Sequence, residues 1–213
     1  TVWQDEGENK SVTSPVSLNI TAFAPVADVR KTVTPQIRTD LGASRLLLID
    51  LGRGQNRIGA SCLAQVYNQV GETPADLDDA KDLVGLFELV QTLQNRDQLV
   101  AYHDRSDCGL LVTLMEMAFA GHCGLSVDIS ALGDEPVSAL CAEEPGVVLQ
   151  IRESDVSAVD ALLNALGLTD LAHWIGVPNE DDRIEILSHG QVCLSGERKT
   201  YQAWWAETSY RMQ

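Results

Sequence analysis

The chain has 213 residues, a formal net charge of −16 and a calculated isoelectric point of about 4.4, and 45% of its residues are hydrophobic. This length suits one large domain or two small ones with a substantial hydrophobic core. The negative charge argues against nucleic acid as a partner, and the lack of an apolar run of eighteen residues argues against a membrane span.

The beginning of the chain indicates a linker followed by a strand. Residues 1–14 are polar and charged, so we expect a linker or the frayed end of an upstream segment. They lack the basic start and apolar middle of a secretory signal. In residues 14–26, SPVSLNITAFAPV, apolar and polar side chains alternate with period two, which predicts a strand.

The next segments predict a buried strand and two helices. Residues 45–52, RLLLIDLG, form a nearly continuous apolar run, as in a strand buried on both faces. A glycine-rich turn leads into a predicted helix over 57–71. Asp76 is placed to cap a helix over 77–96. Its apolar residues at three- and four-residue spacing predict one buried stripe: Leu83, Leu86, Phe87, Val90 and Leu93.

The remainder of the chain mixes strands and helices. We expect strands over 99–103, 124–130, 146–154, 173–178, 182–190 and 191–198. We expect helices over 109–120, 136–143, 155–167 (capped by Asp155 and ended by Gly167) and 201–213. The last three strands are short, with tight antiparallel turns. The pattern predicts an α/β (α+β mixed) fold, a layered mixed sheet with helices packed on it.

The turn between the predicted strand 99–103 and helix 109–120 carries the main functional signal. Asp104 follows an apolar strand at its carboxyl end, where ligands commonly bind in open α/β sheets. The helix start near Gly109 offers backbone N–H groups and a positive dipole end, which suit phosphate oxygens. A carboxylate beside bound phosphate suits Mg²⁺, and Ser106 can donate to a phosphate oxygen.

Helix capping is the simpler interpretation of the same residues. Asp and Ser before a helix are common caps, and glycine there needs only backbone freedom. A cap accounts for one of Asp104, Ser106 and Asp107 and leaves the other two unassigned. The residues alone therefore leave two alternatives, a cap and an anion or metal site.

The segment AYHDRSDCGLLVTLMEMAFAGHCGL, residues 101–125, resembles the matching stretch of phosphoribosylformylglycinamidine synthases, the FGAR amidotransferases of de novo purine synthesis. The resemblance continues, in the family's order, through SPVSLNITAFAPVADVRKTVTPQ, LLLIDLGRGQNRIGASCLAQVYNQVG and the terminal WWAETSYRMQ. It is specific to the large single-chain form of these enzymes. That form has two copies of an ATP-using fold similar to aminoimidazole ribonucleotide synthetase, ahead of a glutaminase domain.

The resemblance implies that this chain is the C-terminal half of the second copy. Residues 1–14 would be a linker from the upstream domain, 15–199 the synthetase-type C-terminal α/β domain, and 200–213 a closing helix leading toward the glutaminase. The family reaction converts FGAR, glutamine, ATP and water to FGAM, glutamate, ADP and phosphate. The amide oxygen is phosphorylated and then displaced by ammonia from the glutaminase.

For individual residues, the resemblance implies that Asp104 coordinates Mg²⁺ and that Ser106 contacts the nucleotide, ATP or ADP. The site would be an auxiliary one with structural ADP, without a catalytic residue in this chain, which would be inactive alone. The implied partners are the first synthetase copy, the N-terminal half of the second copy and the glutaminase domain. Two alternatives are a structural or interaction domain with a vestigial nucleotide contact, and a free-standing kinase-like relative of thiamine-phosphate or selenophosphate enzymes.

One position departs from the family pattern. The family has D-G-G where this chain has Asp107-Cys108-Gly109. If position 108 requires a positive φ or close approach of phosphate, the cysteine side chain would clash. If it only starts a helix, cysteine costs little.

Five cysteines are spread along the chain without C-x-x-C spacing: Cys62, Cys108, Cys123, Cys141 and Cys193. This distribution argues against a disulfide framework or a zinc site and favours a reducing cytoplasm. The glycines in residues 50–61 predict a strand-to-helix turn rather than a phosphate loop. Aromatic residues of the last helix, Trp204 and Trp205, predict a buried seam, or an interdomain contact if they are exposed.

Overall fold

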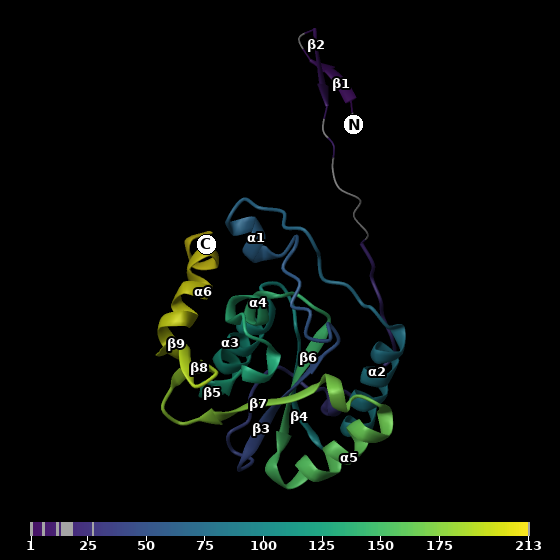
Figure 1. Ribbon diagram of the computed structural model, residues 1–213, viewed down its shortest axis with the longest axis vertical. Helices are drawn as coiled ribbons and strands as arrows, with labels where there is room; N and C mark the ends of the chain where they lie inside the picture. The colour runs from purple at the N-terminus through teal and green to yellow at the C-terminus, as the bar shows by residue number, and fades with distance from the viewer. Residues whose placement is uncertain (1, 6, 12, 14–18, 27, 213) are drawn as a thin grey trace. The chain divides into compact units, whose positions relative to one another are not determined.

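Figure 1 shows the computed structural model, which describes residues 2–5, 7–11, 13, 19–26 and 28–212. The chain forms two compact units, residues 1–32 and 33–213, which we describe separately. In the first unit, strands β1 (Val2–Asp5) and β2 (Glu8–Ser11) pair antiparallel as a hairpin. The segment expected to be a linker thus contains a two-stranded hairpin.

The strand predicted over 14–26 is wrong for the residues that the structure describes. Residues 19–26 have no regular secondary structure, and 14–18 lie outside the described residues. A strand needs a hydrogen-bonding neighbour, and no described strand pairs with 19–26. Its apolar side chains are exposed, with Phe23 at 95%. A single 3₁₀ turn, η1 (Val29–Lys31), closes the described part of this unit.

The second unit is built on a seven-stranded sheet with the order β4-β6-β3-β7-β5-β8-β9. Neighbouring strands are antiparallel except for the parallel pair β5 and β8, so the sheet is mixed. The strands are β3 (Ser44–Asp50), β4 (Leu99–Asp104), β5 (Gly124–Asp128), β6 (Gly146–Arg152), β7 (Ala172–Asn179), β8 (Arg183–Ser188) and β9 (Gln191–Glu197).

Helices cover both faces of this sheet (Figure 1). The helices are α1 (Cys62–Val66), α2 (Ala80–Asn95), α3 (Gly109–Gly121), α4 (Pro136–Cys141), α5 (Val156–Leu166) and α6 (Arg198–Met212). Short 3₁₀ turns are η2 (Ser130–Leu132), η3 (Glu153–Asp155) and η4 (Thr169–Leu171). Helices α2 and α5 pack together over one face, and α3 packs with α4 and α6 over the other.

The alternation along β3 divides its side chains between two hydrophobic cores. Leu46 and Leu48 are fully buried in the core under α3 and α4. Leu47 and Ile49 are fully buried in the core under α2 and α5. A strand that is apolar at every position can do this because successive side chains point to opposite faces. The predicted mixed α/β fold, with a layered sheet and helices packed on it, is confirmed.

Two predicted helix starts differ from the structure. The helix predicted over 57–71 is reduced to α1, because Ala60 has a left-handed backbone (φ 58°) and Gly59 pairs with Pro74. The cap of α2 is Asp79, whose carboxylate accepts from the backbone N–H of Lys81, rather than Asp76.

Two further details of the helix predictions are wrong. The buried face of α2 carries Leu86, Leu89 and Leu93. Two residues of the predicted stripe lie outside it, with Leu83 49% and Phe87 65% exposed. Residue Asp155 precedes α5 as predicted, but its side chain makes no cap hydrogen bond and instead pairs with Arg152 at 3.4 Å.

The last helix, α6, is only partly buried. Trp205 contacts Phe119 of α3 (5.9 Å between ring centroids) and donates from its indole N–H to Glu116. Even so, Trp204 is 66% exposed and Trp205 56% exposed, so the predicted buried seam is wrong. The exposed aromatic side chains are the feature expected of an interdomain contact. Within the described residues, no helix combines the length and apolar character needed to cross a bilayer.

Candidate functional site

The sheet register brings three loops together at one end of neighbouring strands. Asp104, the last residue of β4, lies opposite Val147 near the beginning of β6. Asp50, the last residue of β3, lies opposite Gly146, where β6 begins. The loops after β3, after β4 and before β6 therefore meet, and α1 and α3 start from two of them.

A buried ion pair holds the three loops in place. Arg105, directly after Asp104, is buried and pairs with the buried carboxylate of Asp50. Its Nε donates to the backbone carbonyl of Glu144 at 2.6 Å. The Asp50 carboxylate also accepts from the backbone N–H groups of Gly52 and Gly54. Since a buried charge must be paired and hydrogen-bonded, Arg105 is a structural anchor of the turn.

A second buried pair fixes the loop after β3. The Glu144 carboxylate is fully buried and accepts two bonds from the Arg57 side chain, from Nε and from a terminal nitrogen, both at 2.7 Å, and a third from the Arg57 backbone N–H at 2.8 Å. This bidentate contact raises the pKa of the Arg57 guanidinium. Gly52 is needed beside it, because a Cβ there would lie 2.5 Å from the Glu144 side chain. The glycine-rich segment 50–61 is thus a structural turn, as predicted.

The candidate site residues lie on the outside of this anchored turn. The side chains of Asp104 and Asp107 are exposed and that of Ser106 is partly exposed. None of the three makes a side-chain hydrogen bond or ion pair to another described residue. The capping alternative is therefore wrong for all three, since the residue that precedes α3 is Cys108 and its side chain makes no cap bond.

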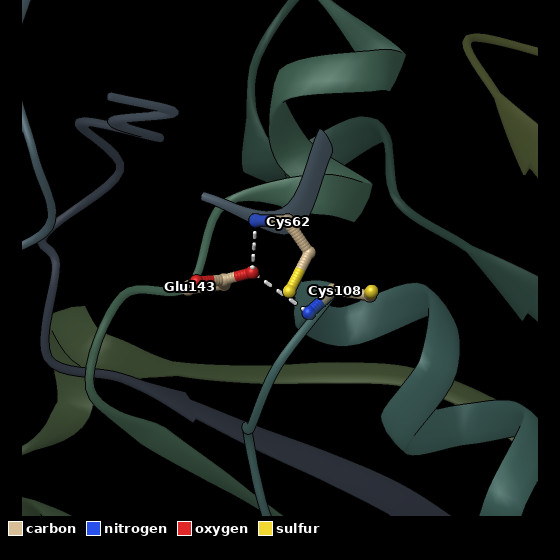
Figure 2. A group of neighbouring side chains, drawn as sticks. All are labelled: Cys62, Cys108 and Glu143. Atoms are coloured by element: carbon tan, nitrogen blue, oxygen red, sulfur yellow. Dashed lines mark hydrogen bonds between the residues drawn. The ribbon is translucent and has the colours of Figure 1, made fainter. Parts of the chain in front are cut away.

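A carboxylate that sequence reasoning missed lies at the start of α3. One oxygen of Glu143 accepts from the backbone N–H of Cys62 and from that of Cys108, both at 2.8 Å (Figure 2). The end of α4 also packs closely against the first residue of α3. A Cβ on Gly109 would lie 2.6 Å from the carbonyl oxygen of Ala142, the residue that follows α4. The protein's own anion thus occupies the place at the α3 N-terminus where we expected phosphate.

Position 108 has the conformation for which cysteine is unfavourable. Cys108 is left-handed, with φ 65° and ψ 12°, and Gly109 follows with φ 71°. A residue with a Cβ pays about 1–2 kcal/mol for this conformation, which glycine adopts freely. The departure from the family's D-G-G pattern is therefore located at a position that requires a positive φ.

His103 and His173 interact with groups other than the exposed side chains of the turn. His103 Nε2 lies 2.8 Å from a carboxylate oxygen of Glu116 on α3, so its ring contacts the helix layer. Burial lowers the pKa of His173; the charge of Asp50 partly offsets this decrease, and the charge of Arg105 adds to it. Neither histidine is paired with a serine or cysteine nucleophile in the hydrogen bonds of the described residues.

The exposed side chains of the turn fit a magnesium–nucleotide group. Mg²⁺ binds oxygen ligands and usually takes one or two carboxylates together with phosphate and water. The Asp104 carboxylate is free of protein partners in the described residues, and the Ser106 hydroxyl is two residues away on the same turn. Because α3 is capped by Glu143, phosphate would be held by Ser106 and the cation rather than by the helix start.

The sequence of residues 45–188 matches the family described as AIR synthase related protein, C-terminal domain. Structure comparison finds PurL from Thermotoga maritima complexed with ATP (TM-score 0.62, 11% identity, 80% of this chain and 27% of that chain). The complex of the same protein with FGAR gives TM-score 0.62, 12% identity, and 81% and 29% coverage. HypE of E. coli, a hydrogenase maturation protein, gives TM-score 0.52, 23% identity, and 76% and 50% coverage.

These structural likenesses show the fold, and they also show that the chain spans only 27–29% of the length of PurL. The matched region of the family, 45–188, contains all three loops of the site described above. It ends at the last residue of β8, before β9 and α6.

Proposed function

This chain belongs to the AIR synthase related family, whose C-terminal domain matches residues 45–188, and we propose that it is part of a large phosphoribosylformylglycinamidine synthase. In this proposal it is the C-terminal half of the second synthetase-like copy and works in the cytoplasm. The whole enzyme would use ATP, glutamine and water to convert FGAR to FGAM. Structures of PurL with ATP and with FGAR support this class of reaction.

The observation that carries the proposal is the exposed carboxylate of Asp104, which has no side-chain partner among the described residues and lies on an anchored turn. Its neighbour Arg105 is locked by the buried pair with Asp50, which fixes the backbone that carries Asp104 and Ser106. A preorganised ligand loses less freedom on binding a cation than one on a mobile loop. Asp104 would ligate Mg²⁺ and Ser106 would donate to a phosphate oxygen of ADP or ATP.

The bound magnesium ion would supply charge neutralisation for the nucleotide phosphates. Among this chain's own residues, Asp104 orients the nucleotide through the cation, and Arg105 and Glu143 keep the turn and α3 in position. We assign no catalytic residue to the chain. The site is proposed as an auxiliary one in which ADP has a structural role.

The proposed partners are the other parts of the same enzyme, namely the first copy, the N-terminal half of the second copy, and the glutaminase. The exposed aromatic side chains of α6, among them Trp204, Trp205 and Tyr210, support a contact of this helix with the glutaminase.

A second candidate function is a structural or interaction domain whose nucleotide contact is vestigial. Two observations favour it. Cys108 stands at a left-handed position where the family has glycine, and Glu143 already satisfies the backbone N–H at the start of α3. In this case the turn would keep its fold without binding nucleotide.

The test is calorimetric titration of the chain with ADP in the presence and absence of Mg²⁺. We expect magnesium-dependent binding that Asp104→Asn abolishes and that Asp107→Asn, its exposed neighbour, retains. The vestigial alternative is favoured if ADP binds the Cys108→Gly variant but not the unaltered chain, or if it binds neither of these two proteins. The chain is also incubated with FGAR, ATP, Mg²⁺ and ammonium, and we expect no release of phosphate. Turnover by the chain alone would contradict the proposed fragment role.

A further inference from the structure

Two thiols and a carboxylate from three separate segments meet beside the turn. Cys62 lies at the start of α1, Cys108 immediately before α3, and Glu143 in the loop after α4 (Figure 2). The two sulfur atoms and a Glu143 oxygen all lie within 4.8 Å of one another, and all three residues are partly buried. The sequence separates these residues widely, so spacing alone argued against a metal site.

The backbone around this cluster is held by interactions independent of any ligand. Glu143 is fixed by the two backbone N–H groups of Cys62 and Cys108, which it binds through one carboxylate oxygen. Ser61 caps α1 through the backbone N–H of Ala64. These bonds hold the two cysteine backbones on either side of one carboxylate, so both thiols can turn toward a common point without unfolding of the loops.

The charges of the cluster favour a cation. Burial raises the pKa of Cys62 to about 11, and the neighbouring Glu143 and Cys108 add to the increase. Burial also raises the pKa of Cys108; a hydrogen bond with Cys62 partly offsets this increase, and Glu143 adds to it. The thiolate forms of the two cysteines would repel one another and the Glu143 carboxylate, because the two sulfur atoms and a carboxylate oxygen lie within 4.8 Å of one another. A divalent cation at the centre removes that repulsion and displaces the thiol protons.

We propose that Cys62, Cys108 and Glu143 form a binding site for a thiophilic divalent cation of the zinc and cadmium class, with water as a fourth ligand. Two thiolates, one carboxylate and a water are a donor set that zinc accepts in tetrahedral geometry. Two sulfurs on one zinc lie about 3.8 Å apart for Zn–S bonds of about 2.3 Å. The sulfur atoms of Cys62 and Cys108 lie within 4.8 Å of one another.

This site is distinct in chemistry from the magnesium–nucleotide site. Mg²⁺ prefers oxygen ligands, whereas thiolates select soft cations. Its occupancy would tie the start of α1 to the start of α3, at the position where the family's glycine is replaced by Cys108. The inference does not depend on the proposed enzymatic function, because Asp104 and Ser106 take no part in it.

The first experiment titrates the reduced chain, kept in a phosphine reductant, with Co²⁺ and Cd²⁺ as spectroscopic probes. We expect a sulfur-to-metal charge-transfer band that saturates at one equivalent and is displaced by Zn²⁺. Cys62→Ser and Cys108→Gly each lower the affinity by roughly 100-fold or more, because each removes a ligand. Cys193→Ser, which removes an exposed cysteine, and Asp104→Asn leave the titration unchanged. Circular dichroism confirms that each variant is folded.

The second experiment uses the unaltered chain and identifies the ligands directly. The chain is alkylated with iodoacetamide with and without Zn²⁺ at mildly alkaline pH, and each cysteine is followed by peptide mass spectrometry. We expect Zn²⁺ to protect Cys62 and Cys108 at least tenfold and to leave Cys193 unprotected. The inference is overturned by an absent charge-transfer band, by an affinity of Cys62→Ser or Cys108→Gly equal to that of the unaltered chain, or by protection that misses either thiol.

Discussion

The carboxylate of Glu143 accepts a hydrogen bond from the backbone N–H of Cys108 at 2.8 Å, so the anion at the start of α3 is supplied by the protein itself. The same oxygen accepts from Cys62 at the start of α1. One side chain thereby joins two loops that are far apart in sequence.

Removal of this carboxylate should loosen both loops. Glu143→Ala leaves two N–H groups without their charged acceptor, so we expect a loss of about 1–3 kcal/mol in the free energy of unfolding. Glu143→Gln keeps an acceptor oxygen and should lose less. Urea unfolding measures both, with Glu88→Ala on the exposed face of α2 as the control. A Glu143→Ala variant as stable as the control would contradict the assigned role.

Glycine at position 108 should stabilise the chain. Cys108 occupies φ 65°, and removal of its Cβ relieves strain of about 1 kcal/mol, partly offset by the greater freedom of glycine in the unfolded state. A β-branched residue is still less suited to this backbone, so Cys108→Val should lower the melting temperature. Thermal unfolding of the two variants gives the order. A melting temperature of Cys108→Gly below that of Cys108→Val would refute the strain argument.

The ion pair of Arg105 with Asp50 should be among the most sensitive positions of the turn. Arg105→Met leaves a buried carboxylate without its cation, which costs about 3–5 kcal/mol. The matched control is Arg38→Ala, because Arg38 pairs with Asp40 on the surface and its loss should be too small to measure. Denaturant unfolding compares the two. Equal stability of both variants would show that the buried pair does not anchor the turn.

The cysteines should differ in reactivity in a pH-dependent way. Burial raises the pKa of Cys62 and of Cys123 to about 11, so their thiolate forms, the reactive species, are scarce at neutral pH. In metal-free chain at pH 7.5 we expect exposed Cys193 to be alkylated first. The rate at Cys62 should rise about tenfold per pH unit up to its pKa. A Cys62 that reacts as fast as Cys193 at pH 7.5 would contradict the raised pKa.

The elements predicted correctly are those whose signal is local. The apolar run 45–52 is β3, and the sequence of strand, turn and helix over 99–120 is β4, the turn and α3. The helix predicted over 57–71 begins later than predicted, because Gly59 pairs with Pro74 instead of entering the helix. Only the folded chain makes this contact. The alternation in 19–26 is equally local, but a strand also needs a neighbour.

The candidate site was predictable in part for the same reason. Asp104 and Ser106 could be proposed from the sequence because they follow an apolar strand directly. Glu143 and Cys62 were missed because they reach the turn through the sheet register and through α1, and their own neighbourhoods carry no motif. The one local signal was the acidic pair Glu143–Glu144 directly before the glycine that begins β6.

Paramagnetic Mn²⁺ in place of Mg²⁺ shows whether Asp104 holds a divalent cation that carries a nucleotide. The amide NMR signals of the chain are recorded with Mn²⁺, with and without ADP. We predict that ADP and Mn²⁺ together broaden the signals of residues 104–107 selectively, and that Asp104→Asn abolishes this broadening while Asp107→Asn preserves it. Equal broadening in the Asp104→Asn variant, or none at residues 104–107 in the unaltered chain, would contradict the account.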